Sequence, residues 1–220
     1  MTAKTRSFVF ACALGASVSV LAIPTASAIT WNFNVPSSPP MLGTTQTYTV
    51  GGVTLTAAGF SSAAALGLPA GPDVNLWGKN LGGDENGVGL VNDPTGDHEI
   101  SGTSLVRIAM AAGLSNVTFQ MGSTTGSDAW EVWGSNVATA LGAPLILFGN
   151  DEGPHSLPFF NFYSFGAAGF LSASGNVLLA AISASPVAVP GPIVGAGLPG
   201  LIAACAGLLA LARRRRRQIA

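Results

Sequence analysis

Charged residues are scarce in this chain of 220 residues: they make up 9% of it, against about 25% in an average soluble protein. Hydrophobic residues account for 48%. The ten acidic residues all lie between positions 73 and 152, where only two basic residues, Lys79 and Arg107, accompany them. The central part therefore has a net charge of −8. A charge of this sign excludes nucleic acid as a partner, because nucleic-acid binding depends on neutralising phosphates.

Cysteine is absent from the central part of the chain. The two cysteines, Cys12 and Cys205, lie in hydrophobic segments near the ends. This excludes a disulfide framework, a thiolate metal site and a cysteine nucleophile in the central part. Histidine is as rare, with only His98 and His155, and the sequence holds no Gly-x-Ser-x-Gly motif. A serine hydrolase needs serine, histidine and an acid that converge, so the sequence predicts no catalytic residues and no enzyme.

The first 28 residues have the pattern of a secretory signal peptide. Lys4 and Arg6 supply the positive start, an apolar stretch covers residues 8–23, and Ala26-Ser27-Ala28 is a cleavage sequence of the Ala-x-Ala kind. We therefore expect an N-terminal signal helix that is removed before Ile29. The Sec translocon and signal peptidase are the partners that this route requires.

The other end combines a proline-rich linker, an apolar segment and an arginine run. The linker covers residues 186–192, and the twenty residues 193–212 carry no charge. A helix of this length spans about 30 Å, the thickness of the hydrocarbon layer. Arginine clusters beside a membrane span stay on the cytoplasmic side, which predicts a cytoplasmic tail over residues 213–220. The sequence thus predicts one transmembrane helix that anchors an exported body on the outer side.

This tail resembles the PEP-CTERM sorting signal of Gram-negative bacteria, in which a short proline-containing motif precedes a membrane helix and an arginine cluster. The matching residues are Val189, Pro190, Gly191 and Pro192, then Arg213, Arg214, Arg215, Arg216 and Arg217. The chain departs from the family at Gly191, where the namesake Pro-Glu-Pro motif has glutamate. The resemblance implies cleavage by an exosortase-type membrane peptidase, which would leave the body at the cell surface or in the extracellular space. An anchor that is never cut is the alternative.

Residues 29–185 have the pattern of a single all-β domain. Short runs rich in Val, Ile, Phe, Thr and Trp alternate with clusters of Gly, Asn, Asp, Ser and Pro, which is typical of strands and turns. The candidate strands are 31–35, 46–50, 53–57, 73–77, 104–110, 116–121, 128–133, 145–148, 159–165 and 176–183. Gly51-Gly52 predicts a two-residue hairpin, and residues 58–68 are expected to form a loop. This many short strands in one domain predicts an antiparallel β-sandwich, jelly-roll-like in pattern.

Two loops rich in oxygen-bearing side chains are candidates for one calcium ion, because calcium takes six to eight oxygen ligands. The candidate ligands are Asp84, Asn86, Asp93, Asp97 and Glu99. Neither loop matches an EF-hand. Solvated loop acids are the alternative, and Glu99 has a structural alternative of its own. It would close its loop by accepting backbone N–H bonds or by pairing with Arg107.

Aromatic side chains that stack on sugar rings are the candidate glycan contacts. Strand alternation places Trp130 and Trp133 on opposite faces, which makes Trp133 one candidate, and Trp77 is the other. Packing in the core is the alternative for each of them.

These features support three hypotheses for the function. The first is a non-catalytic surface or matrix protein that binds exopolysaccharide or another envelope glycan. The second is a structural coat component without a ligand, since low charge and apolar strands favour self-association. The third is an enzyme that acts on extracellular polysaccharide through a pair of carboxylates.

Overall fold

The computed structural model describes residues 27–35, 38–62, 68–124, 128–168, 175–187 and 194–219. Residues 1–26 of the signal segment predicted over residues 1–28 lie outside the described residues. The same holds for the sorting motif Val189-Pro190-Gly191-Pro192. Both therefore stay predictions.

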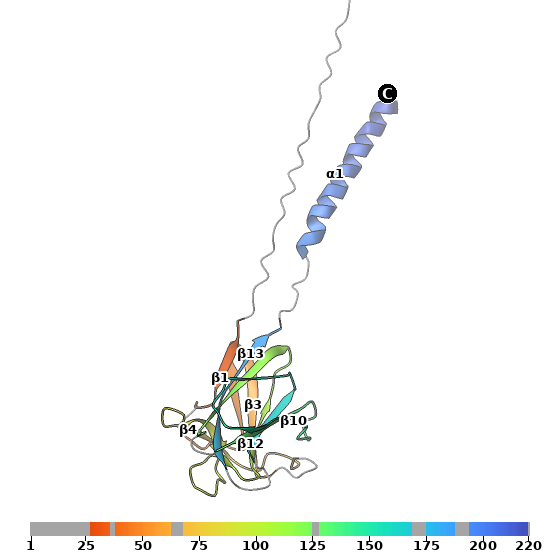
Figure 1. The fold of residues 1–220 in the computed structure, drawn as a ribbon. Coiled ribbons are helices and arrows are strands. Elements are labelled where there is room, and N and C mark those ends of the chain that lie inside the picture. The colour runs from red at the N-terminus through yellow and green to blue at the C-terminus, as the bar shows by residue number, and fades with distance from the viewer. Residues whose placement is uncertain are drawn as a thin grey trace, which may run out of the picture.

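The described chain is mostly β, with two antiparallel sheets (Figure 1). The first seven strands are β1 (Ile29–Asn32), β2 (Thr45–Val50), β3 (Val53–Phe60), β4 (Leu76–Asn80), β5 (Asn86–Leu90), β6 (Ile100–Ser101) and β7 (Leu105–Ala109). The other strands are β8 (Leu114–Gly122), β9 (Trp130–Ser135), β10 (Ala143–Gly149), β11 (His155–Leu157), β12 (Phe162–Ala167) and β13 (Asn176–Pro186). One sheet has the order β11-β8-β13-β5-β4, with β1 and β6 also paired to β13, and the other has the order β10-β9-β12-β7-β3-β2.

The hairpin predicted at Gly51-Gly52 is confirmed. Strands β2 and β3 pair from Val50 opposite Val53 to Thr45 opposite Ala58. Gly51 has φ of 59° and Gly52 has φ of 78°, the left-handed conformation that a tight hairpin turn needs at both positions. Glycine adopts it without the steric cost that a side chain would add.

A large hydrophobic cluster lies between the sheets. Buried side chains of both sheets contribute to it, among them Trp31 and Phe119 from one and Trp130 and Phe165 from the other. The rings of Phe119 and Trp130 pack edge to face with centroids 5.2 Å apart. Each indole N–H has a partner, because Trp31 donates to the carbonyl of Val53 and Trp130 to that of Asp151. Both of these buried indole groups are therefore satisfied in their hydrogen bonds.

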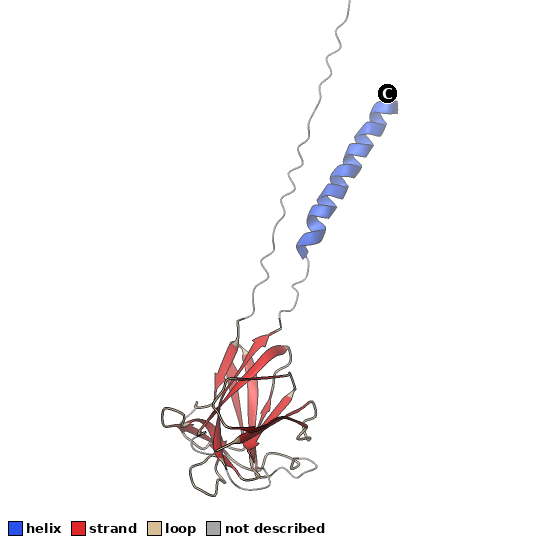
Figure 2. Ribbon diagram, viewed as in Figure 1, coloured by secondary structure: helices blue, strands red, loops and turns tan. Residues whose placement is uncertain are grey.

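The structure of the C-terminal segment contradicts the predicted membrane anchor. Helix α1 (Val194–Ile219) lies apart from the strands in Figure 2. No helix in the described ranges is long and apolar enough to cross a membrane. The prediction of a membrane anchor over residues 193–212, with the body held outside, is therefore wrong.

Candidate functional site

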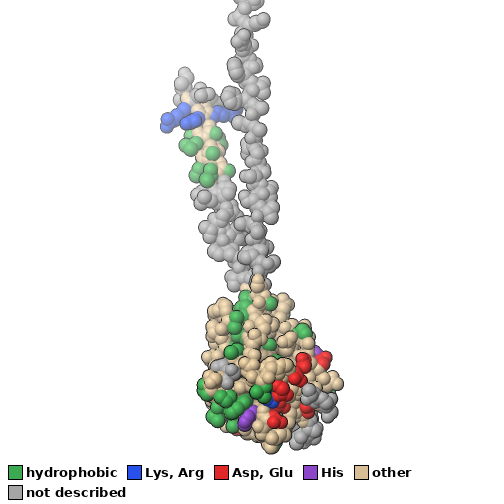
Figure 3. Space-filling view, turned by 90° about the vertical axis from the view of Figure 1, so that its left-hand side faces the viewer, with side chains coloured by type: hydrophobic (Ala, Val, Ile, Leu, Met, Phe, Trp, Pro, Cys, Tyr) green, Lys and Arg blue, Asp and Glu red, His purple; other side chains and the backbone are tan. Residues whose placement is uncertain are grey.

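A cavity of about 760 Å³ lies beside strands β4 and β5 at the edge of the seven-stranded sheet. Figure 3 shows this side of the molecule, where hydrophobic, acidic, basic and histidine side chains meet on one surface. The cavity is lined by Pro40, Trp77, Gly78, Lys79, Asn80, Leu81, Glu85, Gly96, Asp97, His98, Glu99, Ser123, Asp128 and Asn176. The lining therefore comes from β4, from four loops or turns and from the ends of β8 and β13.

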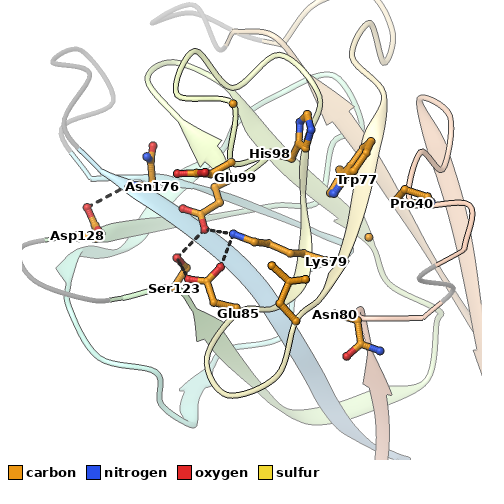
Figure 4. Close-up of a pocket in the computed structure, with 14 residues that line it drawn as sticks. Pro40, Trp77, Lys79, Asn80, Glu85, His98, Glu99, Ser123, Asp128 and Asn176 are labelled. Atoms are coloured by element: carbon orange, nitrogen blue, oxygen red, sulfur yellow. Dashed lines mark hydrogen bonds and ion pairs between the residues drawn. The ribbon is translucent and has the colours of Figure 1, made fainter.

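Lys79 is the centre of a charged cluster inside the cavity (Figure 4). Its Nζ atom lies 2.6 Å from Oε1 of Glu99 and also pairs with Glu85. The hydroxyl of Ser123 lies 2.7 Å from Oε1 of Glu99 and 3.1 Å from Oε1 of Glu85. The side chains of Lys79 and Glu99 are 10% and 5% exposed, and that of Glu85 is 33% exposed. One ammonium group and one hydroxyl thus hold two carboxyl groups close together.

The turn between β4 and β5 places Glu85 opposite Lys79. The N–H of Gly82 donates to Oδ1 of Asn86, and Nδ2 of Asn86 donates to the carbonyl of Gly83. The N–H of Glu85 donates to the carbonyl of Gly82. An asparagine side chain that bonds the backbone in this way fixes a turn. Its amide oxygen and nitrogen are therefore used within the turn.

Asp93 shapes the loop that carries Glu99. Its Oδ1 accepts from the N–H of Thr95 and the hydroxyl of Ser101, and its Oδ2 accepts from the hydroxyl of Thr95 and the N–H of Glu99. Burial alone would raise the pKa of Asp93, but these hydrogen bonds outweigh it and lower the pKa. Asp93 is therefore an internal brace of the loop.

Asp93→Asn tests this brace through its pH dependence. At pH 7 we expect a loss of about 1–3 kcal/mol in the free energy of unfolding, because amide nitrogen cannot replace an oxygen that accepts two bonds. A folded-state pKa below the unfolded value gives stability that is present above the unfolded pKa and disappears as pH falls through the folded pKa. The difference in the free energy of unfolding between wild type and variant, measured by urea unfolding, should therefore become smaller below about pH 4. Asp97→Asn is the control, and a difference that stays constant down to pH 3 would contradict the prediction.

The charges of the cluster influence one another. Burial raises the pKa of Glu99, against hydrogen bonds from Lys79 and Ser123. The hydrogen bond from Lys79 lowers the pKa of Glu85 despite burial. Burial would lower the pKa of Lys79, but its bonds to Glu85 and Glu99 raise it. Lys79 is therefore charged at neutral pH. The pKa values of the two carboxyl groups are shifted in opposite directions, that of Glu99 upward and that of Glu85 downward.

Trp77 forms one wall of the cavity together with His98. Their ring centroids are 3.9 Å apart, with planes tilted by 31°. His98 has a φ of 60°, and its carbonyl accepts from the N–H of Leu90, which holds the loop against β5. Gly89 permits this contact, because a Cβ there would lie 2.0 Å from the carbonyl oxygen of His98. The structure thus places the sequence candidate Trp77 in the cavity.

Trp133 is in a different position from the one predicted. It is 7% exposed and packs in a small cluster with Phe60 and Leu105. Strand β9 is buried along its whole length, because Leu68 and Leu141 cover the face that alternation alone would leave in solvent. Trp133 is therefore not available to a glycan, which corrects the prediction.

The five candidate calcium ligands do not meet at one point. Asp84 and Asn86 line a separate cavity of about 180 Å³, and Asp97 and Glu99 line the larger one. The side-chain oxygens of Asp93 and Asn86 accept hydrogen bonds within the loops described above, and Glu99 pairs with Lys79. Within the described ranges no group of three or more His, Cys, Asp or Glu side chains could hold a metal ion.

The pairing of Glu99 with Arg107 is also corrected. Arg107 lies on β7 in the other sheet, where it donates to the carbonyls of Val137 and Ala140 and lies 4.7 Å from the ring centre of Phe162. Burial lowers its pKa to about 10. The partner of Glu99 is Lys79, and the N–H groups of its loop bond to Asp93.

Sequence reasoning missed Lys79, Glu85 and Ser123 as site residues. One signal was present for Lys79, since it is one of two basic residues in a central part with ten acidic ones. Comparisons with protein-family models, curated proteins and solved structures found no significant match. The chemistry of the cavity therefore rests on its own geometry.

Proposed function

We propose that this protein is a non-catalytic glycan-binding module built on an antiparallel β-sandwich of jelly-roll-like type. Its partner is exopolysaccharide or another envelope glycan, and the cavity beside β4 and β5 is the binding site. We also propose that the C-terminal motif, with its arginine run, is a PEP-CTERM type signal read by an exosortase-type peptidase. The proposal for the tail concerns recognition of this motif and includes no membrane anchor.

The observation that carries the proposal is an aromatic wall beside polar groups in one cavity. A pyranose ring has an apolar face of C–H groups, which packs on an aromatic ring, and hydroxyl groups around its edge. Trp77 with His98 supplies the aromatic surface, while Asn80, Ser123 and the nearby carboxylates supply hydrogen-bonding groups. A cavity with an apolar wall and a few placed polar groups is typical of small-ligand sites.

The arrangement of the carboxyl groups favours binding over catalysis. Glycoside hydrolysis needs two carboxyl groups with the scissile bond between them. Here the ammonium group of Lys79 lies between Glu85 and Glu99 and pairs with both. A glycosidic oxygen would have to displace this ammonium group to reach them.

Trp77→Ala should weaken glycan binding about tenfold or more, because removal of a stacking ring at a binding centre typically costs about 1–2 kcal/mol or more. Isothermal titration calorimetry with the full chain and neutral, amino and anionic oligosaccharides would measure it. Trp133→Phe is the matched control, since this side chain is buried away from the cavity, and it should leave the affinity unchanged.

Three outcomes would contradict the proposal. Equal affinity of Trp77→Ala and wild type would place the site elsewhere. Binding to none of the oligosaccharides would favour a structural coat component. Shortening of an oligosaccharide during the titration, detected by mass spectrometry, would favour an enzyme that uses Glu85 and Glu99.

A further inference from the structure

The exposed charges of the strand-forming part of the chain are all negative. The sequence between positions 29 and 185 holds two basic residues, Lys79 and Arg107. Both are buried, at 9% and 4% exposure. Lys79 is held by two carboxylates, and Arg107 is held by backbone carbonyls and the hydroxyl of Ser164. No cation of this region is therefore left to attract an acidic ligand.

The cavity concentrates the same sign of charge beside its aromatic wall. Glu85, Asp97, Glu99 and Asp128 line it together with a single basic residue, Lys79. Four carboxylates against one ammonium group give a formal charge of −3. Asp97 is exposed, and its carboxylate accepts no hydrogen bond among those of the described residues. Among the described residues, the carboxylate of Asp128 accepts one hydrogen bond, at Oδ1 from the N–H of Asn176 at 3.4 Å. Both can therefore receive bonds from a ligand.

The aromatic wall adds an independent preference for a cation. The face of an indole ring attracts an ammonium group within about 6 Å through its quadrupole, and Trp77 presents such a ring to the cavity. The Nδ1 atom of His98, also in the lining, is buried without a hydrogen-bond partner among the described residues. The cavity thus combines a stacking surface, unused hydrogen-bonding capacity and negative charge.

We propose that the cavity selects glycans whose sugars carry free, protonated amino groups, over acetylated or uronic-acid glycans. This inference rests on the proposed glycan-binding function and names the class of glycan. The sugar ring lies against Trp77, and its ammonium group lies toward Asp97 and Asp128. A uronate in the same place would bring its carboxylate next to four others, and the described body has no free cation to offset the repulsion.

Titration of the full chain with glucosamine oligosaccharides and with N-acetylglucosamine oligosaccharides of equal length tests the inference. At low salt we expect the amino form to bind about five- to tenfold more tightly, because two partly exposed charge pairs contribute about 0.5 kcal/mol or more each. The preference should fall as salt screens these pairs. In Asp97→Asn/Asp128→Asn the ratio of the two dissociation constants should approach one.

The matched control is Asp151→Asn/Glu152→Gln, which removes two negative charges from an exposed loop outside the cavity. It should keep the ratio of the wild type. Equal binding of both oligosaccharides by the wild type, or tighter binding of oligogalacturonate, would overturn the inference and leave the glycan-binding function standing. Binding to none of these glycans would overturn both.

Discussion

Replacing Lys79 with methionine should lower the free energy of unfolding by about 3–5 kcal/mol at pH 7, the typical cost of removing one partner from a buried ion pair. Methionine keeps the length and the apolar stem of lysine but removes the ammonium group. Glu99, with a side chain 5% exposed, would then face Glu85 without a cation between them. Urea unfolding followed by tryptophan fluorescence would measure the loss.

The pH dependence and a double variant separate charge from packing. In Lys79→Met both carboxyl groups lose the cation that favours their ionised forms, so their folded-state pKa values should rise. A raised carboxyl pKa means that folding takes up protons, so the stability of the variant should increase as pH falls through the folded-state pKa. Lys79→Met/Glu99→Gln removes both charges of the more buried pair and should recover most of the loss. A double variant no more stable than Lys79→Met would contradict a role of charge.

Gly89→Ala should destabilise the protein by about 3 kcal/mol, at the upper end of the usual range for overpacking. The added Cβ would lie 2.0 Å from the carbonyl oxygen of His98 and 2.9 Å from Cα of Glu99. These are backbone atoms, so rotation of a side chain cannot relieve the contact. Strand β5 cannot move away from the loop of His98 and Glu99 either, because it pairs along its length with β4 and, at Val88, with Leu179 of β13.

The same substitution should also weaken glycan binding, because the loop that it displaces carries His98 and Glu99. Gly71→Ala is the matched control: no atom lies within 4 Å of its Cβ position, and its stability should stay within about 0.5 kcal/mol of wild type. Equal stability of the two variants in thermal unfolding would contradict the close contact at Gly89.

The strands could be predicted from the sequence where they are long and alternate in hydrophobicity. The predicted run 116–121 lies within β8, and 104–110 contains β7. Strands β6 and β11 have only two and three residues, too few to show a period. Strand β4 was predicted at 73–77 but covers Leu76–Asn80. The predicted strand therefore ended before Lys79, which in the structure lies on β4 and borders the cavity.

The cluster itself could not be predicted, because it depends on contacts between distant segments. Lys79 and Glu99 lie on different segments, and they meet only because Asp93 and Gly89 bring the loop of Glu99 against β5. Ser123 comes from the end of β8, where its N–H also donates to the carbonyl of Asp84. Local periodicity carries no information on such contacts. The prediction of Trp133 as a glycan contact was wrong for a related reason, because loop residues cover its face of β9.

The central place of β13 has a consequence for how the chain folds during synthesis. This last strand pairs with β1, β5, β6 and β8, and Thr30 and Ser183, whose hydroxyls bond across the β1–β13 pair, are 153 residues apart. Four strands therefore stay without this partner until the end of the domain has been made. Contacts of such long sequence separation slow folding, so closure of this sheet waits for the synthesis of its last strand.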